Sequence, residues 1–393
     1  MIVEPVIKGV VAKTAHPIGC EKSVVDQINY IKSQPAIQNA PKRVLILGAS
    51  SGFGLSSRIA LTFAGNADTI GVSFERCPSE GKTGSAGWYN NAAFKKHAEE
   101  NGRIAVNIQG DAFSDDIRDQ VVEAIETYFE GEVDLVVYSL ASGVRPKPDG
   151  EGMWRSCIKP INASYKANTI CLENNEWQSH TLQPASNDEI ESTVKIMGGQ
   201  DWESWIDTLI NSESIAEGFN TVAFSYIGPE STHPIYLDGT LGRAKIDLHQ
   251  TSHSLNLKLA NFSGNAYTTV CKALVTKASV FIPGLTPYLM ALYKVMKEEG
   301  SHETCMEQMY RLYANKLYTE NQKVPVDGER LIRIDDWEMQ SKIQAQVNEI
   351  LSKMDQNNFA DLADYQGVKD EFLKINGFAH PEIDYSKDVD IDI

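Results

Sequence analysis

A glycine loop between a buried strand and a helix constrains the fold of this chain more than any other feature. The apolar run Val44–Leu47 predicts a short buried strand. Gly48, Gly52 and Gly54 follow it directly, in the spacing GxxxGxG. Because glycine has no Cβ, the backbone can turn tightly there and approach a phosphate, while the N–H groups of the next helix point at it. The loop therefore predicts a site for the pyrophosphate of a dinucleotide, with a plain tight turn as the alternative.

A carboxylate lies where a dinucleotide-binding fold would place its ribose contact. The apolar run Thr69–Phe74 ends in Glu75, which is 21 residues after Gly54. An acid about 20 residues beyond the glycine loop holds the ribose hydroxyls of NAD and repels the 2′-phosphate of NADP. We interpret Glu75 as selecting NADH, while Arg76 beside it leaves room for some use of NADPH. A solvated glutamate at a strand end is the alternative.

Apolar runs recur along the chain and are separated by segments that can form helices. This alternation is typical of a parallel sheet covered on both faces, so we predict an α/β fold with a doubly wound parallel sheet. The expected strands are 44–47, 69–74, 104–108, 135–138, 222–227 and 267–275. Ligands bind at the carboxyl ends of such strands. Asp111 could contact adenine there and Ser139 the nicotinamide ribose, although turn or capping chemistry explains both equally well.

We expect one composite domain over residues 1–393, in which three additions enlarge the sheet. The parts are an N-terminal arm (1–40), a dinucleotide-binding core (41–150 and 185–300), a polar β-hairpin insertion (150–185) and a helical C-terminal extension (301–393). The hairpin strands are expected at 165–172 and 177–182. The apolar stretch 278–293 is too short for a typical membrane span. It is consistent with the lining of an apolar tunnel or with an ordinary buried helix.

Charge and cysteine usage exclude several classes of partner and site. The chain has a formal net charge of −17 and no basic run that offsets it, so we expect no nucleic-acid binding and no stable membrane insertion. Its six cysteines show no CxxC motif and no paired ligand spacing, which is typical of reduced thiols and predicts no metal site. The amino terminus lacks the basic region and apolar core of a signal peptide. We therefore expect a cytoplasmic protein.

A tyrosine and a lysine follow the fifth expected strand. Tyr236 precedes Lys245 with eight residues between them, and nine steps at about 100° would place them on opposite faces of one helix. We therefore expect Tyr236 to lie before the helix, with Gly239 and Gly242 supplying the break. A tyrosine hydroxyl can donate a proton at neutral pH, and a nearby ammonium would lower its pKa. Lys245 could supply that charge while holding a ribose or phosphate.

Several segments resemble one family in the same order along the chain. The loop spacing resembles the short-chain dehydrogenase superfamily, which implies a Rossmann-like sheet. Within it the chain resembles the FabV-type trans-2-enoyl reductases nearly end to end, and the gap between Tyr236 and Lys245 is the spacing of that family. The matching segments are GASSGFG at 48–54, AGWYNNAAF at 86–94, GDAFSD at 110–115, VYSLAS at 137–142, IMGGQDW at 196–202, SYIGPE at 225–230, GRAK at 242–245 and RIDDWE at 333–338.

The resemblance implies NADH-dependent reduction of the trans-2 double bond of an enoyl thioester, carried by acyl carrier protein or coenzyme A, in fatty acid synthesis. It also implies a monomer. Tyr236 matches the proton donor of the family, Lys245 its cofactor-holding lysine and Tyr226 a tyrosine that contacts substrate. The residues that match its NADH contacts are Gly48, Ala49, Ser50, Ser51, Gly52, Phe53, Phe74, Glu75, Asp111, Ala112, Leu140, Ala141, Lys245, Leu274, Val275 and Thr276.

The chain departs from the family at a few positions. Lys277 stands where the family usually has glutamine, and Val280 and Phe281 replace smaller residues, which leaves the preferred acyl chain length open. An acidic carrier protein would be repelled by the net charge unless the fold gathers a local basic patch. Two other functions stay open from the sequence. A short-chain dehydrogenase acting on a ketone or alcohol would need a closer Tyr/Lys pair, and an NADH sensor without turnover would not need Tyr236 and Lys245.

Overall fold

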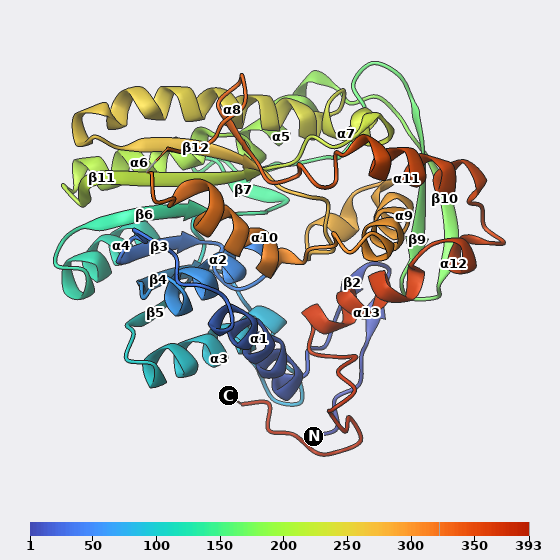
Figure 1. Cartoon of the computed structure of the whole chain (residues 1–393), viewed down its shortest axis with the longest axis horizontal. Coiled ribbons are helices and arrows are strands. Elements are labelled where there is room, and N and C mark those ends of the chain that lie inside the picture. The colour runs from blue at the N-terminus through green and yellow to red at the C-terminus, as the bar shows by residue number, and fades with distance from the viewer. Residues whose placement is uncertain (322, 393) are drawn as a thin grey trace.

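A parallel β-sheet forms the centre of the molecule. Its strands are β3 (Arg43–Leu47), β4 (Asp68–Ser73), β5 (Ala105–Gln109), β6 (Val133–Tyr138), β11 (Ile215–Ser225), β12 (Asn265–Val270) and β13 (Leu331–Arg333). The structure, a computed structural model, describes residues 1–321 and 323–392, and over these residues the strands follow the order β13-β12-β11-β6-β3-β4-β5 (Figure 1). Neighbouring strands in this sheet run parallel. The doubly wound parallel sheet that the sequence predicts is confirmed.

Both faces of the sheet are buried, as continuous apolar strands require. Val44 and Ile46 of β3 face one layer of helices, whereas Leu45 and Leu47 face the other. The first layer contains α1 (Pro17–Lys32), α2 (Gly52–Phe63), α3 (Ala86–Glu100) and α10 (Cys305–Leu312). The second contains α4 (Asp115–Tyr128), α6 (Gln200–Asn211) and α8 (Thr240–Leu259), with α5 (Asn187–Met197) packed on α8. The strand order changes direction between β3 and β6, which is where such sheets bind ligands.

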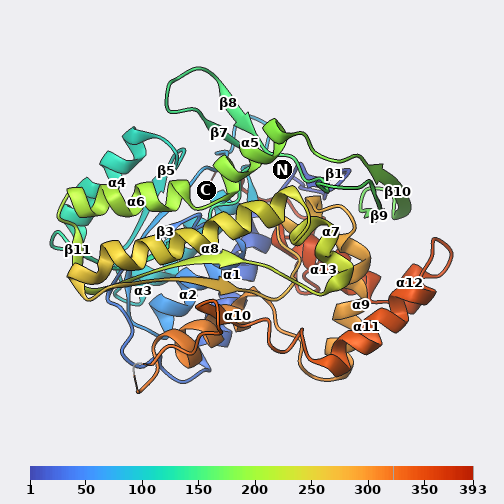
Figure 2. The same cartoon turned by 90° about the horizontal axis from the view of Figure 1, so that it is seen from above.

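A second hydrophobic core covers the carboxyl ends of β11 and β12. It is built from the hairpin β9 (Tyr165–Cys171) and β10 (Glu176–Leu182) and from α9 (Leu285–Glu298), α11 (Ser341–Lys353), α12 (Phe359–Leu362) and α13 (Tyr365–Ile375). These elements lie together at one end of the molecule, beside the sheet (Figures 1 and 2). The predicted hairpin is confirmed to within one residue. The apolar stretch 278–293 forms a short turn, η3 (Ser279–Phe281), and most of buried α9, which agrees with the buried-helix interpretation.

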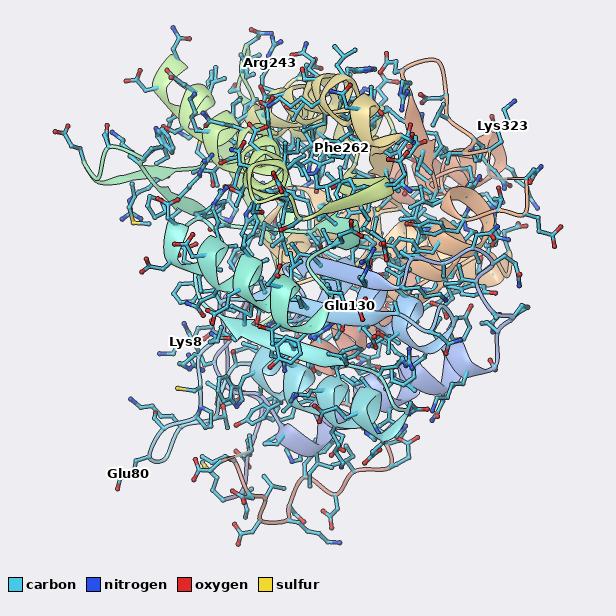
Figure 3. The ribbon with its side chains drawn as sticks, turned by 90° about the vertical axis from the view of Figure 1, so that its left-hand side faces the viewer. Lys8, Glu80, Glu130, Arg243, Phe262 and Lys323 are labelled. Carbon is cyan, nitrogen blue, oxygen red and sulfur yellow. The ribbon has the colours of Figure 1, made fainter. Side chains whose placement is uncertain are left out.

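Smaller elements connect these layers. They are the hairpins β1 (Ile7–Lys8) with β2 (Val11–Ala12) and β7 (Val144–Pro146) with β8 (Met153–Arg155), helix α7 (His233–Tyr236), the turns η1 (Glu230–Thr232) and η2 (Ala260–Phe262), and the π-helical turn η4 (Tyr313–Leu317). The β7–β8 hairpin, which the sequence did not indicate, projects from the body (Figure 2). Glu80 projects at the tip of the loop between β4 and α3 (Figure 3). The first residue contacts the last part of the described chain, because the amino group of Met1 donates to the Val389 carbonyl across 2.7 Å.

The sequence prediction differs from the structure in three strands. β11 begins at Ile215, seven residues before the expected start at 222, and ends at Ser225. β12 ends at Val270 rather than at 275. Cys271 still donates to the carbonyl of Ser225 in β11, but the N–H groups that follow bond to side chains, that of Ala273 to Glu338 and that of Val275 to Tyr293. β13 lies in the extension that was expected to be helical, where its three residues give too short a signal to be recognised. Within the described ranges, none of the helices is both long and apolar enough to span a bilayer.

Candidate active site

The glycine loop packs so closely on the neighbouring chain that two of its positions exclude any side chain. Gly48 has φ +88°, and a Cβ there would lie 2.4 Å from the carbonyl oxygen of Ser139, just beyond β6. A Cβ on Gly54 would lie 1.9 Å from the carbonyl oxygen of Gly48. Real Cβ contacts are never this short, so the loop holds its shape only with glycine at both positions. The interpretation of this loop as a built feature therefore agrees with its geometry.

The loop opens α2 with donors that can face an anion. Ser51 is the N-cap of α2 and makes no side-chain capping bond, whereas α10 and α13 are capped by Thr304 and Asp364. The first N–H groups of α2 thus keep the partial positive charge of a helix terminus for a ligand. Thr276 lies on the other side, because a Cβ on Gly52 would be 3.8 Å from its methyl group. This cradle fits the pyrophosphate of a dinucleotide.

Glu75 is held at the end of β4 rather than solvated. Its side chain is 11% exposed and receives hydrogen bonds from the hydroxyls of Ser50, at 2.5 Å, and of Ser85. The ammonium group of Lys277 lies 3.4 Å from the same carboxylate. The alternative of a solvated strand-end glutamate is therefore wrong. Phe74 beside it is 78% exposed, an unusual position for a large apolar ring and one that suits contact with a flat ligand.

The other residues expected to hold NADH follow strands of the same sheet edge. Asp111 follows β5, where its Oδ1 accepts from the N–H of Phe113 at 3.0 Å, so the turn chemistry left open by the sequence is present. Ala112 is buried, and its carbonyl accepts from the indole of Trp205 at 3.1 Å. Leu140 and Ala141 follow β6, next to the glycine loop. The sheet thus gathers these positions along one edge.

Tyr236 lies before the helix that carries Lys245, as its spacing predicts. It is the last residue of α7, and α8 begins at Thr240 with Gly239 as its N-cap. Gly242 does not supply the break, which corrects one expectation, because it lies in the first turn of α8. A Cβ on Gly242 would lie 2.3 Å from the Leu237 carbonyl oxygen, so this glycine allows the link between the helices to pack against α8.

Tyr236 and Lys245 converge on the end of β11. The ring of Tyr236 packs edge-to-face on Tyr226, with 4.6 Å between the ring centroids. The ammonium group of Lys245 donates to the carbonyl of Phe224 across 3.0 Å. The ring of Phe53, from the glycine loop, lies 5.5 Å from the ring of Phe224. The candidate catalytic pair and the candidate phosphate cradle therefore meet at one strand end.

Burial sets the protonation of this pair. It raises the pKa of Tyr236 above the ordinary value of 10.0, with a further contribution from the carboxylate of Glu338, so the hydroxyl is protonated at neutral pH. The expectation that Lys245 lowers this pKa is wrong for this structure, because desolvation dominates. Burial lowers the pKa of Lys245 to about 8. His249, one turn along α8, bonds to Ser225 at 2.8 Å, and burial lowers its pKa to about 4.

Two cavities border this site. The smaller, of about 10 Å³, lies beside Tyr236 and is also lined by Tyr165, Ile235 and the segment 282–285. That space holds about one water molecule, so residues of the apolar stretch 278–293 line a small cavity here. The larger, of about 210 Å³, lies between the N-terminal arm and Lys277, and Lys13 and Arg76 also line it. These three cations form a local basic patch in an acidic chain.

One buried residue of the site was not indicated by the sequence. Glu338 is fully buried, and its carboxylate accepts from the hydroxyl of Tyr226 at 2.8 Å. The segment 333–338 is one of those that resemble the family, but its residues are a run of charges around Trp337, which is normal for a surface loop. Nothing in the pattern separates Glu338 from its exposed neighbour Asp336. Only the fold reveals the contact.

Comparison with known proteins identifies relatives over almost the whole chain. The family model described as the trans-2-enoyl-CoA reductase catalytic region matches residues 82–318, and the NAD(P)H binding domain of trans-2-enoyl-CoA reductase matches residues 2–80. A third model, the enoyl reductase FAD binding domain, matches residues 326–389. Enoyl-[acyl-carrier-protein] reductase [NADH] 2 of Vibrio parahaemolyticus is 66% identical over 393 residues, covering 100% of this chain and 98% of the relative.

Two solved structures share the fold closely. Trans-2-enoyl-CoA reductase of Clostridium acetobutulicum in complex with NADH has a TM-score of 0.96 at 42% identity and covers 100% of this chain and 98% of its own. The Treponema denticola enzyme in complex with NAD has a TM-score of 0.93 at 45% identity and covers 99% of this chain and 98% of its own.

The segment matched by the FAD model does not fit an anionic dinucleotide. Two guanidinium groups near the start of this segment are not available to a pyrophosphate, because Arg333 is bonded to Asp335, and Arg311 of α10 to Asp336. At α13, the N–H of Gly367 is already bonded to Asp364 at 3.0 Å. The glycine loop before α2 fits a dinucleotide, and the segment 326–389 instead contributes to the site through the buried side chain of Glu338.

Proposed function

The chain belongs to the trans-2-enoyl-CoA reductase family, and from this premise we propose that Tyr236 and Lys245 carry its reaction at the end of β11. The protein is an NADH-dependent enoyl reductase that forms a saturated acyl thioester in fatty acid synthesis. The ketone or alcohol reductase and the silent NADH sensor that the sequence left open find no support in this family. One observation carries the proposal: three groups meet at the end of β11. Tyr236 packs on Tyr226, while Lys245 and Phe53 both contact Phe224.

NADH, when bound, supplies the hydride that adds to the β-carbon of the enoyl thioester. Negative charge then develops on the thioester oxygen, and a hydroxyl placed there stabilises it only if it keeps its proton. Tyr236 meets this condition because burial raises its pKa. We assign the hydrogen bond to the developing oxyanion to Tyr236. A proton taken from water adds at the α-carbon and completes the saturated thioester.

We propose that the remaining residues bind the two substrates. The free N–H groups at Ser51, Gly52 and Phe53 would hold the pyrophosphate, and cationic Lys245 would hold the nicotinamide ribose. Glu75 would accept from the adenosine ribose hydroxyls, which supports selection of NADH. Tyr226 would contact the thioester substrate. The remaining cofactor contacts would come from Gly48, Ala49, Ser50, Phe74, Asp111, Ala112, Leu140, Ala141, Leu274, Val275 and Thr276.

We propose that the enzyme accepts enoyl groups on either carrier and works as a cytoplasmic monomer. Both carriers present the same pantetheine arm, and the basic patch of Lys13, Arg76 and Lys277 supplies local attraction for an acidic carrier. All six cysteines lie in the described part of the chain as free thiols, which suits a reducing compartment. We also propose that the parts of the chain form one composite domain, because Glu338 of the extension bonds to Tyr226 of the core.

Turnover assays test this proposal. NADH absorbance is followed with crotonyl-CoA, with the same acyl group on acyl carrier protein and with an unactivated ketone, and the products are identified by mass. We expect NADH oxidation with both thioesters, formation of the saturated acyl product and no reaction with the ketone. Reduction of the ketone alone would contradict the proposal. Light scattering of the purified protein at several concentrations tests the monomer.

A further inference from the structure

Glu338 makes an unusual set of contacts for a buried carboxylate. Its Oε1 accepts from the hydroxyl of Tyr288 at 2.6 Å and from that of Tyr226 at 2.8 Å. Its Oε2 accepts from the N–H of Ala273 at 2.7 Å. A buried carboxylate is stable only when hydrogen bonds replace its lost water, and these three donors provide them. The side chain is therefore part of a built arrangement, not an accident of packing.

The three donors connect different parts of the site. Tyr226 follows β11 and touches Tyr236. Ala273 lies in the loop after β12, directly before residues 274–276, which are expected to hold NADH. Tyr288 comes from α9 in the helical cap. One carboxylate thus joins the tyrosine on the substrate side to the loop on the cofactor side.

The direction of these bonds decides which tyrosine can donate to substrate. Both tyrosine hydroxyls donate to Glu338, so the hydroxyl proton of Tyr226 points at this carboxyl group and away from the reacting atoms. Its ring is held edge-to-face on Tyr236. Among the described residues, none accepts a hydrogen bond from the hydroxyl of Tyr236. The proton of Tyr236 is therefore the one available to the thioester oxygen.

Glu338 is itself fixed by the C-terminal extension. Its carbonyl accepts from the amide of Gln344 in α11 at 2.8 Å. On the other side, the carbonyl of Ile334 accepts from Gln308 at 2.9 Å and from Arg311 at 2.6 Å, both in α10. Buried and satisfied bonds of this kind hold a chain segment in one position.

We propose that Glu338 is a positioning residue of this reductase, which fixes Tyr226 beside Tyr236 and ties it to the cofactor loop at Ala273. The inference rests on the roles proposed above for Tyr226 and Tyr236. It gives the C-terminal extension a part in the reaction, because that segment supplies the carboxylate.

A double-mutant cycle between E338A and Y226F tests the proposal, with kcat/KM for crotonyl-CoA measured at saturating NADH. If Glu338 acts through Tyr226, each single variant loses activity, and the double variant loses little more than whichever single variant is less active. We expect E338A to lower kcat/KM by about tenfold or more. We expect the kcat/KM of the double variant to lie within about threefold of that of the less active single variant. Independent losses that multiply in the double variant would overturn the proposal.

Control variants separate positioning from folding. E338Q fills the same volume and keeps an acceptor for Tyr226, so we expect it to recover much of the activity lost in E338A. If E338A does not fold, E338M replaces it in the cycle, because its apolar side chain of similar length accepts no strong hydrogen bond from Tyr226. D335N alters another buried carboxylate in the same segment, bonded to Arg333 at 2.8 Å and not to a tyrosine. We expect D335N to lower the melting temperature while kcat/KM stays within about threefold of wild type. A loss in D335N equal to that in E338A would contradict a specific role.

The cycle also distinguishes this inference from the proposed function. If Y236F keeps normal turnover, the proposed catalytic role fails whatever the cycle shows. If Y236F is inactive and the E338A and Y226F losses multiply, only the role of Glu338 fails.

Discussion

The hydroxyl of Tyr226 donates to the carboxylate of Glu338 across 2.8 Å, although 112 positions separate the two residues in the chain. This bond joins the end of β11 to the segment that follows β13. The catalytic strand end and the C-terminal extension therefore form one structural unit.

The glycine loop provides the first prediction. In Gly54→Ala the new methyl carbon would lie 1.9 Å from the carbonyl oxygen of Gly48. Since this contact is too short, the loop must change shape. We expect the Kd for NADH, measured by fluorescence titration, to rise by about tenfold or more and the protein to lose about 1–3 kcal/mol of stability. Gly328→Ala is the matched control, because a Cβ there meets no atom within 4 Å. Equal NADH affinity in G54A and wild type would show that the loop does not hold the cofactor.

The second prediction concerns the choice between NADH and NADPH. Glu75→Ala removes the carboxylate that would repel a 2′-phosphate and frees Lys277, which now lies 3.4 Å from it. We expect the ratio of kcat/KM for NADH to that for NADPH to fall by about tenfold. Glu80→Ala, at the exposed tip of the same loop, should leave the ratio unchanged (Figure 3). A ratio in E75A that matches wild type would remove Glu75 from cofactor selection.

The third prediction concerns pH. Because burial lowers the pKa of Lys245 to about 8, the free enzyme loses this cation as the pH rises through that value. We expect kcat/KM, which reports the free enzyme, to decline above about pH 8. Lys245→Arg should move the decline to higher pH, since a guanidinium stays charged. A decline at the same pH in both proteins would assign it to another group.

Unfolding does not account for the decline in kcat/KM, because the titration of Lys245 makes the folded protein more stable as the pH rises. Between pH 8 and the ordinary lysine value of 10.5, the unfolded chain still binds a proton at Lys245 that the folded chain has released. The contribution of this group to the free energy of unfolding therefore rises with pH across the window. Melting temperatures measured from pH 7.5 to 9.5 check this point.

Local pattern predicted most of the sheet and part of the site. Runs such as Val44–Leu47 are apolar throughout because both faces of the sheet are covered, so they could be recognised without a structure. The break before Lys245 followed from helix geometry alone. Gly242 was assigned wrongly because its lack of a Cβ serves packing against Leu237, not a turn.

The remaining features depend on contacts distant in sequence. β13 is too short to recognise and joins the sheet only by pairing with β12. The pKa of Tyr236 rises because of burial, which no local pattern reports. Glu338 looks like any other acid of a charged segment until the fold brings it to Tyr226 and Ala273.

The turnover of Tyr236→Phe tests the central claim most directly. NADH oxidation with crotonyl-CoA is measured beside NADH binding, with Tyr128→Phe, an exposed tyrosine at the end of α4, as the control. The account predicts that Y236F loses about a hundredfold or more in kcat while its Kd for NADH stays within about threefold of wild type, because only the donor to the developing oxyanion is removed. Near-normal turnover in Y236F would contradict it.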